Sequence, residues 1–100
     1  MSKRQDRVQT RHPDPTKSMP AIEGWRYEAV RKAILTAVPT TGEGLLFKEL
    51  PGKVREAIPA ESLENLGSVS WYTTTVKLDL EARGEVKRVR GSRPQRLLRC

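Results

Sequence analysis

The 100-residue sequence has a single cysteine, Cys100, and a single histidine, His12. One cysteine excludes an internal disulfide, and the lack of a cysteine cluster excludes a cysteine-rich zinc site. His12 lies among polar residues, where a histidine is usually solvated. No apolar run approaches the roughly 20 residues of a membrane span, and the polar N-terminus lacks the apolar middle of a secretory signal. We therefore expect a cytoplasmic protein with no metal site and no membrane partner.

The sequence also lacks the residue patterns that catalysis needs. A nucleophile with a base, a carboxylate pair or a metal cluster would be required, and the acidic residues are scattered along helix exteriors. Asp79 and Glu81 are two positions apart and lie on different sides of one predicted helix. The segment "TTGEG" lacks the lysine of a phosphate-binding loop. We expect no enzyme, no cofactor and no small-molecule ligand.

Positive charge is concentrated at the two ends of the chain. The formal net charge of +7 divides into +3 for residues 1–21, −2 for residues 22–82 and +6 for residues 83–100. A basic end favours nucleic acid or another acidic partner, although it can also simply improve solubility.

Residues 1–21 contain three prolines, few apolar residues and no periodicity. Such a segment buries too little surface to offset the entropy lost on ordering. This predicts a disordered basic arm over residues 1–21, followed by one folded domain over residues 22–99.

Two helices are expected in the first half of this domain. Apolar residues at helical spacing predict one over residues 22–37, which Pro39 ends, and another over residues 47–58, which Pro59 ends. Leu45 and Leu46 could form a short strand before the second helix. A brief helical turn over residues 61–67 follows.

A third helix is predicted between an N-cap at Ser68 or Ser70 and a left-handed glycine, Gly84. Its core side is expected to consist of Val69, Thr73, Val76 and Leu80. A polar strip consists of Ser70, Thr74, Lys77 and Glu81. A second apolar stripe consists of Trp71, Thr75, Leu78 and Ala82. This stripe either packs within the chain or forms a surface for a partner.

The last residues predict a β-hairpin. The segments "EVKRVR" and "QRLLR" are short and rich in valine and leucine, and "GSRP" between them is typical of a turn. Val86 and Val89 are three positions apart, so a bulge or a twist is needed if both face inward.

The order of three helices and a basic hairpin resembles the winged-helix transcription regulators, whose third helix often closes with a Leu-x-x-x-Gly-x-Val pattern. Here the pattern is Leu80, Gly84 and Val86. "GSVSWYTTTVKLDLEARGEV" and "GSRPQRLLR" are also similar to a small bacterial family of winged-helix-like proteins of unknown function, over residues 22–99. The resemblance implies an α+β winged helix: a three-helix core, a C-terminal two-stranded wing and a short third strand near Leu45 and Leu46.

We therefore expect duplex DNA binding, as in a transcription regulator, through the third helix and the wing. Thr73 is a weaker candidate because it shares the core side. Alternatively, the wing arginines are only a solvated edge that discourages strand pairing. The predicted nucleic-acid contacts are Ser70, Thr74, Lys77, Lys87, Arg88, Arg90, Arg93 and Arg96.

A second hypothesis is a protein-interaction or dimerisation module on the same scaffold, without DNA binding. Trp25, Trp71 and Leu78 would be its contacts, because tryptophan buries a large area at low entropic cost. The partner would be a second copy of the chain or another protein.

Overall fold

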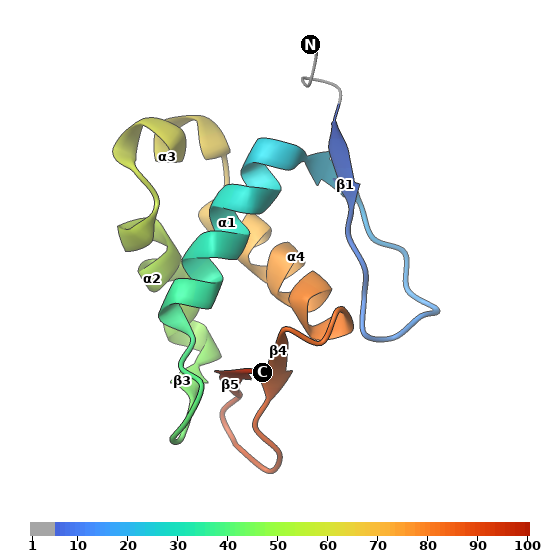
Figure 1. Cartoon of the computed structure of the whole chain (residues 1–100), viewed down its shortest axis with the longest axis vertical. Coiled ribbons are helices and arrows are strands. Elements are labelled where there is room, and N and C mark those ends of the chain that lie inside the picture. Colours follow the sequence, from blue (N-terminus) through green and yellow to red (C-terminus); the bar gives the residue numbers. More distant parts are fainter. Residues whose placement is uncertain (1–5) are drawn as a thin grey trace.

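The computed structural model describes residues 6–100. This part of the chain is an α+β structure with four α-helices and two small antiparallel sheets (Figure 1). The elements, in chain order, are β1 (Arg7–Gln9), β2 (Ala21–Glu23), α1 (Gly24–Ala37), β3 (Leu45–Leu46), the 3₁₀ turn η2 (Phe47–Glu49), α2 (Leu50–Ala57), α3 (Ala60–Leu66), α4 (Val69–Ala82), β4 (Val86–Arg88) and β5 (Arg96–Arg99).

The core lies where α1, α2 and α4 pack against one another. Val30 and Ile34 of α1 meet Val54 of α2 and Leu80 of α4 in one buried apolar cluster. Helix α1 begins at Gly24, two residues later than predicted, because Ile22 belongs to β2. The three predicted helices and the brief turn at α3 are thus all present.

Helix α4 has both predicted end signals. The Ser68 hydroxyl accepts a hydrogen bond of 3.1 Å from the backbone N–H of Trp71, which satisfies a free donor of the first turn. At the other end Gly84 has a φ of +79°, in the left-handed region that closes helices. All four residues of the expected core side, Val69, Thr73, Val76 and Leu80, are buried.

The C-terminal hairpin joins the predicted short strand in a three-stranded antiparallel sheet of order β3-β5-β4. Leu97, at its centre, pairs with Leu45 on one side and Arg88 on the other, and its side chain is buried. The anticipated bulge is unnecessary, because β4 ends at Arg88 and Val89 lies beyond the strand. The order of helices and strands is compatible with a winged-helix arrangement.

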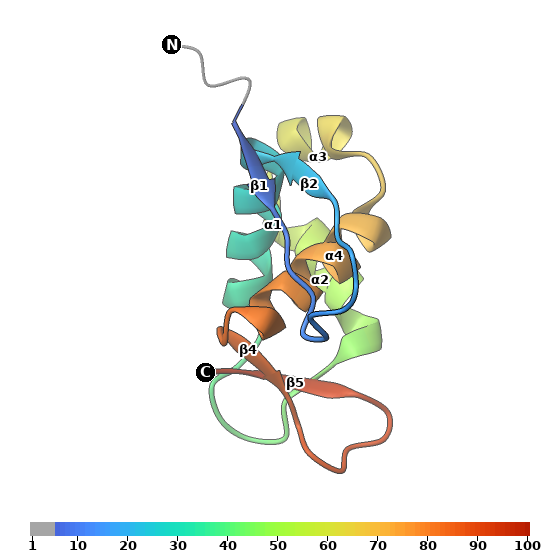
Figure 2. The ribbon, with the colours of Figure 1, turned by 90° about the vertical axis from the view of Figure 1, so that its right-hand side faces the viewer.

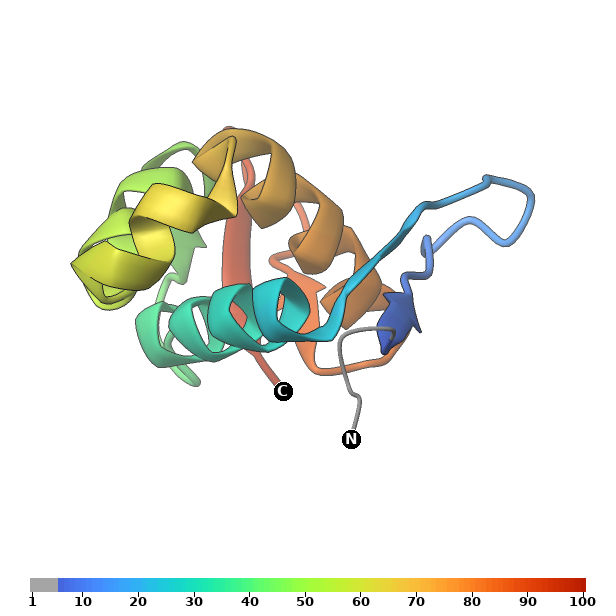
Figure 3. The same cartoon turned by 90° about the horizontal axis from the view of Figure 1, so that it is seen from above.

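The expected disordered arm is wrong for the described residues 6–21. Strands β1 and β2 form a hairpin in register Val8↔Ile22, and Thr10 is buried. In Figure 2 this hairpin crosses in front of α1 and α4, and in Figure 3 its loop extends away from the helices. Backbone pairing and contacts with α4 offset the ordering entropy that the composition could not. Residues 1–5 of the expected arm lie outside the described residues.

The hairpin also changes the expected domain boundary. The proposed division between residues 21 and 22 falls inside β2, whose Ala21 pairs with Gln9. Residues 6–21 therefore pack on the domain predicted for residues 22–99.

Candidate nucleic-acid interface

Three of the predicted wing cations are free at the surface. Lys87 lies on β4, and Arg90 and Arg93 lie in the turn between β4 and β5. All three are exposed, and none has an ion-pair partner within residues 6–100. The turn is held by a hydrogen bond of 2.9 Å from the Val89 N–H to the Arg96 carbonyl. These cations are therefore carried by a hairpin that is anchored through β5 to the core.

The other wing arginines contact the protein itself. Arg88 Nε lies 2.9 Å from Glu81 Oε1, although the Arg88 side chain remains 53% exposed. Arg96 Nη1 donates to the Gly44 carbonyl at 3.0 Å. Both were predicted to contact nucleic acid, and both have other partners that reduce their positive potential at the surface.

Lys77 must be removed from the predicted contacts. Its side chain is only 3% exposed, and its Nζ lies 2.6 Å from Glu81 Oε2 and 4.6 Å from the centre of the Phe47 ring. Burial lowers the pKa of Lys77, against the opposing effect of Glu81. Helical spacing placed Lys77 on a polar strip, but Phe47 of η2 and Gln95 of the wing contact its ammonium group in the folded protein. Ser70 and Thr74, earlier on the same strip, are exposed.

Part of the second apolar stripe of α4 packs within the chain, and part of it lies at the surface. Thr75 is buried and Leu78 is half-buried, whereas Trp71 is 47% exposed. Neither intramolecular packing nor complete exposure describes the whole stripe.

Both exposed tryptophans belong to one row of planar side chains. The Arg26 guanidinium lies 4.9 Å from the centre of the Trp25 ring and 5.8 Å from that of Tyr72. Tyr72 and Trp71 meet edge to face, with ring centres 4.8 Å apart. Arg26 is fixed by Glu23 at 2.9 Å and by the Leu66 carbonyl at 2.7 Å. We call these four side chains the aromatic row: Trp25, Arg26, Tyr72 and Trp71.

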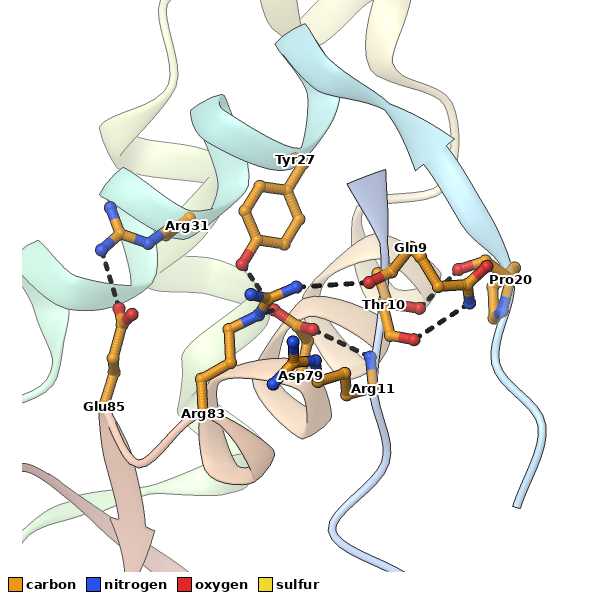
Figure 4. Close-up of polar contacts among 9 residues, drawn as sticks. All are labelled: Gln9, Thr10, Arg11, Pro20, Tyr27, Arg31, Asp79, Arg83 and Glu85. Atoms are coloured by element: carbon orange, nitrogen blue, oxygen red, sulfur yellow. Dashed lines mark hydrogen bonds and ion pairs between the residues drawn. The ribbon is translucent and has the colours of Figure 1, made fainter. Parts of the chain in front are cut away.

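Asp79 joins the N-terminal hairpin to the helices, as Figure 4 shows. Its fully buried carboxylate accepts hydrogen bonds from the Tyr27 hydroxyl, from Arg83 Nε at 2.8 Å and from the Arg11 backbone N–H at 2.8 Å. Arg83 also donates to the Gln9 carbonyl at 3.2 Å. The carboxylate is therefore paired and hydrogen-bonded, as a buried charge must be.

The same contacts shift two pKa values. Burial, together with the bond to Asp79, raises the pKa of Tyr27, and the bond to Asp79 raises that of Arg83. Sequence reasoning missed Asp79 as an organising residue. The only local signal was an acidic residue between Leu78 and Leu80, four positions before an arginine. Its third partner, Arg11, is 68 residues away.

The described residues hold no group of three or more metal-ligating side chains. Within the same part of the chain, no helix is long and apolar enough to cross a bilayer. A shallow groove between α1 and α2 is lined mainly by small residues, with Lys32 and Lys53 at its margins.

Together the fold and the exposed cations define a small α+β protein with a winged-helix-like element order and a basic hairpin. A model of a family of unknown function, DUF6958, matches residues 7–97, and the chain therefore belongs to that family. The match begins at the first residue of β1, so it includes the N-terminal hairpin. No curated protein and no solved structure matches the chain.

Proposed function

We propose that this protein is a cytoplasmic, duplex DNA-binding protein that holds the phosphate backbone with its wing, in the manner of a bacterial transcription regulator. The observation that carries the proposal is the set of three free cations, Lys87, Arg90 and Arg93, on an anchored hairpin. Arginine and lysine side chains in such positions engage phosphate oxygens and release the counterions condensed on DNA.

The N-terminal hairpin adds a second group of cations. Arg11 and Lys17 are exposed in the loop between β1 and β2, and neither side chain has an ion-pair partner in the described chain. The Arg11 backbone N–H is bonded to Asp79 of α4, so the start of this loop is anchored on the helix, while the rest of the loop projects away from it (Figure 3). Exposed cations on both hairpins therefore support contacts with the phosphate backbone.

Helix α4 contributes less charge than a typical DNA-reading helix. Its exposed polar residues, Ser70 and Thr74, have hydroxyls that can bond phosphates or several bases. No arginine or asparagine on this helix is positioned for a bidentate base contact. Affinity should therefore depend mainly on the wing.

The test is the salt dependence of binding to a fluorescent duplex, measured by anisotropy. The three wing cations, by neutralising three phosphates, should contribute about −3 to the slope of log K against log salt. The double variant Arg90→Ala/Arg93→Ala should reduce the steepness of that slope by about 2 and weaken binding at low salt. The matched control is Lys32→Ala/Lys53→Ala, which removes two exposed charges beside the α1–α2 groove. It should change the slope very little.

Two results would contradict the proposal. One is no binding of any duplex at low salt. The other is an equal loss of affinity in both double variants, which would leave the wing cations as a solvated edge that only discourages strand pairing.

The aromatic row favours a second candidate function, a protein-interaction or dimerisation surface. Trp25 is 42% and Trp71 47% exposed, and the two are the large apolar side chains exposed in the described chain. Tryptophan and arginine are the residues most enriched at the centres of interfaces. A molecular mass that rises with concentration in light scattering, and that Trp71→Ala returns to one chain, would favour this function over DNA binding.

A further inference from the structure

The outer strip of α4 is uncharged. We give this name to Ser70, Trp71, Thr74 and Leu78, of which the last three follow helical spacing of i, i+3 and i+7 on one side. The neighbouring charges are withdrawn from the surface, since Lys77 and Glu81 pair at 2.6 Å and are almost completely buried. The outer strip therefore presents two hydroxyls, an exposed indole and a half-buried isobutyl group.

The hydroxyl and apolar groups of the outer strip are better suited to contact the methyl group of thymine than the hydrogen-bonding groups of the other bases. In the major groove, guanine, cytosine and adenine present hydrogen-bonding groups, whereas thymine adds a methyl group. A strip without amide or charged side chains cannot make bidentate bonds to guanine or adenine. Its apolar groups can contact thymine methyls, and the Thr74 side chain adds a methyl of its own.

The wing also favours A·T base pairs, but for a different reason. Arg93 lies in the turn of the wing, exposed and without an ion-pair partner among the described residues. The minor groove of A·T-rich DNA is narrow and strongly negative, and it attracts arginine side chains inserted into it.

We propose that the outer strip of α4 reads thymine methyl groups, with Trp71 as the main contact, and that the protein prefers A·T-rich duplex DNA. The inference rests on the proposed function, because the wing must first hold the duplex. Trp71 is the specificity-determining residue because it is the more exposed of the two large apolar side chains at the surface of the described chain and lies in the first turn of α4. Residues near the N-terminus of such a helix are those that approach base edges.

A substitution in the DNA tests this directly. Two A·T-rich duplexes of identical sequence are compared, one with thymine and one with deoxyuridine, which lacks only the 5-methyl group. The wild-type protein should bind the thymine duplex about fivefold more tightly, the magnitude expected for burying one or two methyl groups. Trp71→Ala should bind both duplexes equally, with the wild-type affinity for the deoxyuridine duplex.

The matched control is Trp25→Ala. This residue is a tryptophan of similar exposure in the same aromatic row, but it lies on α1 and not on the outer strip. This variant should keep the preference for thymine. Circular dichroism of each variant verifies its helix content, and the comparison of the two duplexes with wild-type protein needs no variant at all.

Each other outcome overturns part or all of the inference. Salt-dependent binding with equal affinity for both duplexes overturns methyl reading and leaves the wing proposal standing. A preference for thymine that survives Trp71→Ala overturns the role of Trp71. No binding of either duplex overturns the inference together with the proposed function.

Discussion

The two β-hairpins differ in whether the residues that stabilise them lie nearby or far away in the sequence. The C-terminal hairpin, β4–β5, has its valine and leucine residues and its turn within fifteen residues. The N-terminal hairpin, β1–β2, has few apolar residues and depends on Asp79 of α4, which binds the Arg11 backbone. A hairpin with local determinants can be recognised from sequence, whereas one held by a distant buried carboxylate resembles a disordered segment.

The largest effect that separates the hairpins is expected for Asp79→Ala. The change leaves Tyr27, Arg83 and the Arg11 N–H without their acceptor, and breaking such a buried pair costs about 4 kcal/mol. Urea unfolding measures the loss. Hydrogen exchange should show the Thr10 amide, bonded to the Pro20 carbonyl, losing more protection than the Val89 amide of the wing.

Asp14→Ala is the control for that prediction. Asp14 is an exposed aspartate in the same hairpin, and among residues 6–100 its carboxylate accepts hydrogen bonds only from the Thr16 N–H and hydroxyl. We expect a change below about 0.5 kcal/mol. Equal effects of the two substitutions would show that the N-terminal hairpin does not depend on the buried carboxylate.

A somewhat smaller loss is expected at the C-terminal hairpin for Leu97→Ala. Leu97 is fully buried at the centre of the three-stranded sheet, and truncating such a leucine costs about 3 kcal/mol. Leu98→Ala, at the half-buried neighbour, should cost about 1 kcal/mol. Here the wing amides should lose protection first, the reverse of the order for Asp79→Ala. The same order in both variants would argue against separate determinants.

Gly44→Ala should weaken the attachment of the wing by about 2 kcal/mol. Gly44 has a φ of +91°, and an added Cβ would lie 2.7 Å from the Leu97 carbonyl oxygen. Gly42→Ala shares the positive φ, +89°, but has open space around it, so it should cost only about 1 kcal/mol. The difference between the two variants in the free energy of unfolding, measured with urea, reports the steric cost of a Cβ at Gly44 against β5. Equal free energies of unfolding would contradict this steric explanation.

The smallest effect, about 1.5 kcal/mol at neutral pH, is expected for Tyr27→Phe, which removes one hydrogen bond to the charged Asp79 carboxylate. The folded state raises the pKa of Tyr27 above its ordinary value near 10. Above about pH 10 the folded protein therefore keeps a proton that the unfolded chain loses, and stability falls as pH rises.

Tyr27→Phe should make this alkaline loss of stability shallower in urea unfolding at several pH values. The control is Tyr72→Phe, which leaves the Tyr27–Asp79 contact in place. An unchanged pH profile in Tyr27→Phe would contradict the assignment.

The candidate site was predictable only in part. Exposure of Ser70, Thr74, Lys87, Arg90 and Arg93 follows from their positions on a helix face and a basic hairpin. The burial of Lys77 could not be predicted in this way. Phe47 covers its ammonium group and Glu81 forms an ion pair with it only in the folded protein. Trp25 and Trp71 likewise become part of one row, through Arg26, only because α1 packs against α4.

The sequence by itself determined the helices, the wing and their order, because apolar spacing, Ser68, Gly84 and the turn residues act within a few positions of one another. Only the tertiary structure decided which charges stay at the surface and whether the N-terminal segment folds. Those outcomes depend on desolvation and pairing between residues far apart in the chain, such as Asp79 and Arg11. Local sequence patterns do not indicate which distant residues will be in contact.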